Sequence, residues 1–162
     1  MKNIHSAVTL SIGMLVTSFT LPAWAGVEPP IELNAIPATI MQQAQEQFPD
    51  ATFGSANTET EPGGNFVYEI QGILQDGRKL EYDVNPSGEI QEVEIEFQSD
   101  MVPGAVMKAI QKNLPGFTPT FIEASHSASM QVVGYEFVGQ IGKNTIDINV
   151  SADGSKIEIS DK

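Results

Sequence analysis

One stretch of the sequence occurs twice. The copies span residues 36–49 and 102–115, and each opens and closes with an apolar residue followed by a proline. Pro103 lies 66 residues after Pro37 (103 minus 37), and the prolines that end the two copies keep the same spacing. Because a repeat usually marks a structural unit that is used more than once, this feature limits the possible folds more than any single motif does.

Each copy predicts one amphipathic helix. Proline suits the first position of a helix, where a missing N–H costs nothing, and a later proline ends the helix. Apolar residues recur every four positions between these prolines and form one apolar stripe. The stripe consists of Ile36, Ile40, Ala44 and Phe48 in the first copy and of Val102, Val106, Ile110 and Leu114 in the second.

The residues after each helix predict four strands. Apolar and polar side chains alternate there, with turn sequences between the runs, and the Asp-Gly pair at residues 76–77 is typical of a tight hairpin. The predicted strands cover residues 51–60, 66–71, 80–84 and 90–97 in the first half, and 117–125, 133–137, 146–150 and 157–159 in the second.

These elements predict an α+β fold made of two α-β4 repeats, over residues 36–98 and 99–162. We expect both helices to pack on one face of an antiparallel sheet, and the opposite face to be open and acidic. One repeat alone is close to the size at which a hydrophobic core becomes marginal, so we expect the two to form one continuous domain. Two separate domains joined by a linker are the alternative, but residues 98–101 are too few for a flexible linker. Residues 26–35 show no periodicity and are interpreted as a lead-in.

Residues 1–25 have the features of a secretory signal peptide. Lys2 is followed by a mostly apolar run over residues 7–21, and then by Ala23-Trp24-Ala25, which fits the A-x-A pattern of a signal-peptidase cleavage site. An uncleaved anchor is the alternative, but the run is short for a membrane span. The chain has no cysteine, which leaves no acceptor for a lipid anchor and no disulfide. We therefore predict a periplasmic or secreted protein that does not insert into a membrane after signal cleavage.

The charge of the chain restricts its partners. The sequence carries 21 acidic and 8 basic residues, a formal net charge of −13. Without residues 1–25, which hold one basic residue and no acid, the charge is −14 (7 minus 21). Such a chain is repelled by nucleic acid and by anionic membranes. It favours a basic protein surface, a cation, or solubility alone.

The order of motifs resembles a known family. Each proline-bounded helix is followed by a Tyr-Glu-apolar strand (residues 68–70 and 135–137) and by a strand that ends in a glycine turn (residues 84–88 and 150–154). This pattern, over residues 36–162, resembles a tandem PepSY-like repeat, in the group that includes modules similar to beta-lactamase inhibitory protein. The resemblance implies an exported, non-catalytic module that inhibits or regulates a protein such as a peptidase.

The sequence predicts no catalytic residue, no cofactor and no metal site. His126 is the one histidine after the signal peptide, and its small polar neighbours indicate a solvated loop rather than a general base. A base also needs an orienting partner, and none is identifiable. A small hydrolase is therefore the least favoured function. Tyr68 and Tyr135 belong to the repeated strand and are interpreted as core residues.

Carboxylates gather in the polar phase of the predicted strands. They are Glu69, Glu81, Asp83, Glu92, Glu94, Glu96, Glu136, Asp147 and Glu158. A solvated sheet face that keeps the protein soluble explains them, and so does a docking face for a basic protein, which a concentrated negative potential would attract. Loose calcium binding is a third interpretation, although no twelve-residue calcium loop is present. The predicted function is an exported binding module that docks a protein with a basic surface, such as a peptidase or a sensor domain, through the acidic sheet face. The alternative is a calcium-responsive structural module of the cell envelope.

Overall fold

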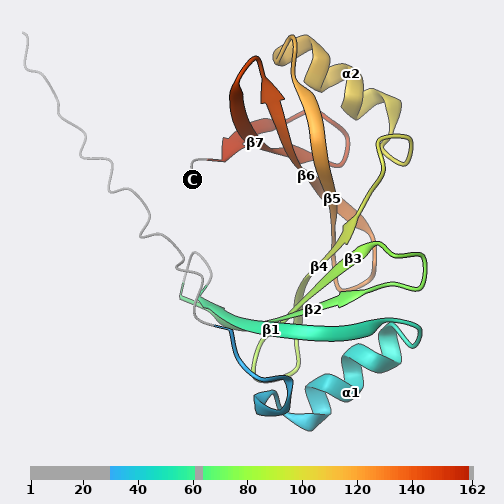
Figure 1. Ribbon diagram of the computed structural model, residues 1–162, viewed down its shortest axis with the longest axis vertical. Helices are drawn as coiled ribbons and strands as arrows, with labels where there is room; N and C mark the ends of the chain where they lie inside the picture. The colour runs from blue at the N-terminus through green and yellow to red at the C-terminus, as the bar shows by residue number, and fades with distance from the viewer. Residues whose placement is uncertain (1–29, 61–63, 161–162) are drawn as a thin grey trace, which may run out of the picture.

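The computed structural model describes residues 30–60 and 64–160, so the predicted signal peptide lies outside the described residues. Their strands form one antiparallel sheet of eight strands in chain order (Figure 1). The strands are β1 (Thr52–Thr60), β2 (Phe66–Ile73), β3 (Lys79–Val84), β4 (Ile90–Glu96), β5 (Thr118–His126), β6 (Val132–Ile141), β7 (Asn144–Ser151) and β8 (Ile157–Ser160). The helices are η1 (Leu33–Ala35, 3-10), α1 (Ala38–Gln47) and α2 (Gly104–Asn113).

Both α-helices begin directly after a proline and end one residue before the last apolar residue of the stripe, Phe48 in α1 and Leu114 in α2. Pro37 precedes α1 in extended conformation, and its carbonyl accepts the N–H of Ile40 at 2.9 Å. At the other end the Phe48 N–H donates to the Ala44 carbonyl at 2.9 Å. The helices are thus slightly shorter than the sequence predicts. Among the described residues, no helix is long and apolar enough to cross a membrane.

The helices bury their apolar stripes against one face of the sheet, on its outer, convex side (Figure 1). Ile40 and Ala44 of α1 pack on residues of β1 to β4, and Val106 and Ile110 of α2 pack on residues of β5 to β7. Phe97, which follows β4, contacts both hydrophobic clusters. The core therefore continues from one half of the sheet into the other.

The structure corrects the predicted fold class. Two α-β4 repeats do not describe it, because the described residues form a single eight-stranded sheet with two α-helices of 10 residues each, and far more residues lie in strands than in helices. The physical reason is that β4 pairs with β5, from Val93 opposite His126 to Glu96 opposite Glu123, and the Phe97 N–H extends the ladder to the Ile122 carbonyl at 2.8 Å. The backbone hydrogen bonds between β4 and β5 therefore join the two halves of the sheet without a break. The residue limits of the two repeats remain predictions.

Candidate docking face

The sheet face opposite the helices is hollowed. Figure 1 shows the sheet curling around an inner side, with α1 and α2 outside the curve. A cavity of about 540 Å³ on the inner side is lined by residues of β1, β2, β3 and β5. Because β1 and β5 are separated by three strands in the sheet, their contribution to one cavity shows how strongly the sheet bends. The predicted open face is therefore concave.

All nine predicted site residues lie on this face, which we call the carboxylate face. Their strand partners place them in one phase of the sheet, but their exposure differs. Glu69 and Asp147 are buried, and Glu158 is exposed and paired with Lys156 at 2.7 Å. The half-buried members are Glu81, Asp83, Glu92, Glu94, Glu96 and Glu136.

Acidic residues face each other across neighbouring strands. Asp83 of β3 lies between Glu69 of β2 and Glu92 of β4, and Glu81 lies opposite Glu94. Oxygens of Glu69, Glu81 and Asp83 lie within 4.8 Å of one another. Like charges at directly opposite positions destabilise a sheet, so this arrangement costs folding free energy when all the groups are ionised. Asp147 and Glu158 lie on β7 and β8, away from this group.

Burial and mutual repulsion shift the titration of Glu81, Asp83 and Glu94 toward the protonated form. Burial, followed by the charges of Glu69 and Glu94, raises the pKa of Asp83 to about 8. Burial and the Glu92 charge raise the pKa of Glu94 to about 8. Burial, the Glu69 and Asp83 charges and a hydrogen bond to Glu69 raise the pKa of Glu81 well above its ordinary value. At neutral pH the face therefore holds protons as well as negative charge.

Neutral side chains orient the buried Glu69. The Asn57 amide donates to Glu69 Oε1 at 3.0 Å, and the Gln71 amide donates to the same oxygen at 2.6 Å. Gln71 in turn accepts a hydrogen bond from the Ser55 hydroxyl at 2.9 Å. These contacts connect β1 and β2 and hold the carboxylate toward β3. Fixed donors of this kind reduce the cost of burying a polar group.

Sequence reasoning missed three residues of this face. Glu123 of β5 lies between Glu96 and Glu136, and burial followed by the Glu136 charge raises its pKa to about 7. Phe121, two residues earlier on the same strand, lines the cavity, and the Lys79 ammonium lies 4.7 Å from the centroid of its ring. The alternation of residues 121, 123 and 125 carries a signal for this phase. The pairing of β4 with β5, which brings them to the acidic cluster, does not follow from alternation.

The expectation of a solvated loop around His126 is wrong. His126 is the last residue of β5, it is buried, and its Nδ1 lies 3.2 Å from the Val93 carbonyl oxygen. A carbonyl only accepts, so Nδ1 carries the proton. The ring also contacts Phe97 edge-on, with 6.0 Å between centroids. The histidine lies on the helix-covered face, which gives it a structural position rather than one beside the carboxylates.

Among the described residues, Glu69, Glu81 and Asp83 form the group whose ligand atoms lie close enough for one cation. Calcium accepts carboxylate oxygens at such positions. Protons relieve the same repulsion, as the raised pKa of Asp83 shows. The group alone therefore does not define a metal site.

Comparison with solved structures places the fold. The chain is similar to a BLIP-like protein from Bacteroides fragilis NCTC 9343, with a TM-score of 0.54, 21% identity, and coverage of 77% of this chain and 86% of that one. It also aligns with a periplasmic protein of unknown function from Bacteroides vulgatus ATCC 8482, with a TM-score of 0.37, 20% identity, and coverage of 82% and 100%. No protein-family model and no curated protein matches the chain. The fold is thus BLIP-like, and the PepSY assignment remains a prediction.

Proposed function

We propose that the protein is an exported, non-catalytic binding module that docks a basic protein surface on its carboxylate face and inhibits or regulates that protein. The observation that carries this proposal is the concentration of opposed carboxylates on one concave face. Such a face costs stability in the free protein, and a partner that supplies positive charge removes this cost. A sheet face that served only solubility would need neither the concavity nor the burial.

The raised pKa values give the docking a specific chemistry. In the free protein, protons on groups such as Asp83 and Glu94 limit the repulsion at neutral pH. A cationic side chain replaces these protons, so docking releases them and strengthens as the pH rises toward 8. Salt weakens the attraction, because exposed charges are screened beyond about 8 Å at physiological ionic strength.

Export and the absence of catalysis belong to the proposal. Residues 1–25 support export through their signal-peptide pattern. The BLIP-like neighbour is named for an inhibitor, which is in keeping with a binding role. His126 is buried on the helix-covered face, on the opposite side of the sheet from the carboxylates.

The proposal is tested by capture with two matched triple variants. The first replaces Glu92, Glu94 and Glu96 of the carboxylate face by Gln, which keeps their shape. The second replaces Glu46, Asp50 and Asp100, which are exposed outside this face, by the corresponding amides. Both change the formal net charge by the same amount, and capture at pH 9 ensures that Glu94, with a pKa of about 8, is mostly ionised in the wild type. The immobilised proteins are incubated with a native envelope extract, and bound proteins are identified by mass spectrometry.

The expected result is a basic protein that the wild type and the second variant retain and the first variant loses. Equal retention by all three proteins would show that the carboxylate face is not the docking site. Removing the repulsion is expected to stabilise the first variant, so a lost partner cannot be attributed to unfolding. If 1 mM calcium instead raises the melting temperature and no basic protein is retained, the calcium-responsive alternative replaces docking.

A further inference from the structure

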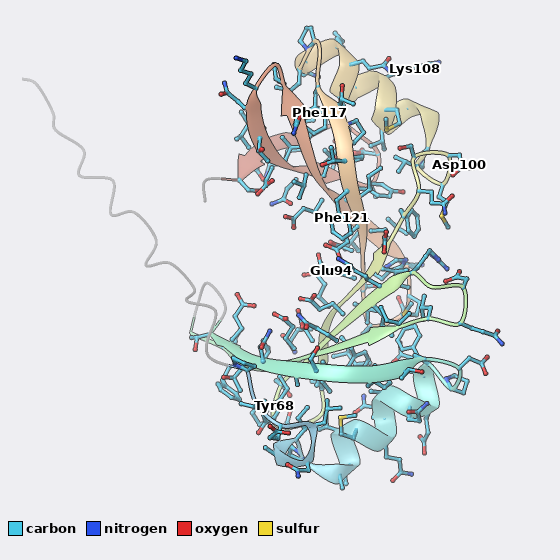
Figure 2. The ribbon with its side chains drawn as sticks, viewed as in Figure 1. Tyr68, Glu94, Asp100, Lys108, Phe117 and Phe121 are labelled. Carbon is cyan, nitrogen blue, oxygen red and sulfur yellow. The ribbon has the colours of Figure 1, made fainter. Side chains whose placement is uncertain are left out.

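The cavity beside the carboxylates combines apolar, aromatic and acidic walls. Ile73 of β2 contributes an apolar side chain that is 46% exposed, and Phe121 of β5 contributes the face of a half-buried ring. Glu81 of β3 and Glu123 of β5 supply carboxylates to the same cavity. Phe121 and Glu94 lie along the inner side of the curved sheet (Figure 2). A ligand that fills this cavity therefore needs an apolar stem and a positively charged end.

We propose that this cavity receives an arginine side chain of the basic partner, with the stem along Ile73 and the guanidinium between Phe121 and the two carboxylates. This inference rests on the docking function proposed above and names the side chain that the face recognises. A guanidinium stacks on aromatic rings and binds carboxylates through its planar fork, and its aliphatic stem covers apolar surface.

The chain's own Lys79 shows that the cavity favours a cation. Its ammonium lies 4.7 Å from the Phe121 ring centroid, and its charge lowers the pKa of Glu123 against the larger effects of burial and Glu136. Lys79 is exposed at the start of β3 and lines the cavity. In the free protein it therefore holds the place over the ring that the arginine takes in the complex, and it competes with the arginine for this place.

The probe is N-acetylarginine methylamide, and the neutral isostere N-acetylcitrulline methylamide is its control. The amide signals of Gly72, Lys79, Phe121 and Glu123 are followed by NMR in the full exported chain at pH 8. The arginine compound is expected to shift them saturably, and the citrulline compound is expected to leave them unchanged. Phe121→Leu should weaken binding about 3- to 5-fold, the range of one exposed cation–π contact.

Lys79→Met provides the sharper test, with Lys156→Met as its matched control. Both variants remove one positive charge, but Lys156 pairs with Glu158 on β8 and does not line this cavity. Lys79→Met should tighten arginine binding at least about 3-fold because a competitor is gone. Lys156→Met should change it less than about 1.5-fold because a distant exposed charge is screened by salt.

Two results would overturn the proposal: equal shifts with arginine and citrulline, or equal effects of the two lysine variants. Either would leave the docking function to be judged by the Glu92, Glu94 and Glu96 triple variant alone. Conversely, arginine binding in the cavity together with unchanged capture by that triple variant would refute docking through the wider face while supporting the arginine site.

Discussion

Replacing Glu94 by Gln should stabilise the protein at alkaline pH and not at acidic pH. Glu94 lies near the centre of the carboxylate face (Figure 2), opposite Glu81 on one side and Ser125 on the other. Burial and the Glu92 charge raise its pKa from 4.5 to about 8. Between these values the folded protein binds a proton that the unfolded chain does not. The stabilising effect of this proton is therefore complete below pH 4.5 and is lost as the pH rises through 8.

The size of the effect follows from the difference between the two pKa values. That difference is about 3.5 (8 minus 4.5), which corresponds to at most about 5 kcal/mol at 1.36 kcal/mol per pH unit. Partial exposure screens the charge, and neighbouring carboxylates share the proton, so we expect about 2–3 kcal/mol. Gln remains neutral in both states, and its carbonyl oxygen still accepts the Ser125 hydroxyl that Glu94 accepts at 3.2 Å.

The assay is urea unfolding of the wild type and Glu94→Gln between pH 4 and pH 9.5. The free energies of unfolding should coincide near pH 4.5 and differ by about 2–3 kcal/mol at pH 9. Glu46→Gln, at an exposed position of α1, is the control and should stay within about 0.5 kcal/mol of the wild type. If the free energies of unfolding of Glu94→Gln and the wild type changed with pH in the same way, the carboxyl group at this position would not be buried beside other negative charges.

Four further substitutions test the packing. The buried Tyr82 hydroxyl has no hydrogen-bond partner among the described residues, so Tyr82→Phe should raise the free energy of unfolding by about 1 kcal/mol, and a loss of stability would contradict this. A Cβ on Gly139 would lie 2.6 Å from a carbon of the Phe117 ring, so Gly139→Ala should cost about 1–3 kcal/mol, and a neutral effect in thermal unfolding would contradict this packing. Tyr135 is 5% exposed and Tyr68 is only partly buried, so alanine should cost about 3–5 kcal/mol at Tyr135 and clearly less at Tyr68, and equal costs would count against the different burial.

The local periodicity of apolar residues was sufficient to predict the helices and strands. The prolines at 37 and 103 lead directly into helices, and the four-residue stripes face the sheet. Alternation alone put residues such as Glu92 and Glu94 in one phase, because successive side chains of a strand point to opposite faces. Both signals act over a few residues and need no knowledge of distant contacts.

Features that depend on long-range pairing could not be predicted in this way. Glu123 and Phe121 join the carboxylate face only because β5 pairs with β4 and the sheet bends. The same pairing draws His126 into a strand beside Val93, although its small polar neighbours are typical of a loop. It also joins the two predicted α-β4 units by continuous hydrogen bonding, since a repeated sequence does not show where strand pairing stops.

The exchange of protons for a cationic partner can be measured by a carboxyl-carbon NMR titration of the free protein and of its complex with N-acetylarginine methylamide. We expect midpoints near pH 8 for Asp83 and Glu94 in the free protein. We also expect the midpoint of Glu123, near pH 7 when free, to fall once the arginine compound is bound. Midpoints near pH 4 without ligand, unchanged by its addition, would contradict a face that exchanges protons for a cationic partner.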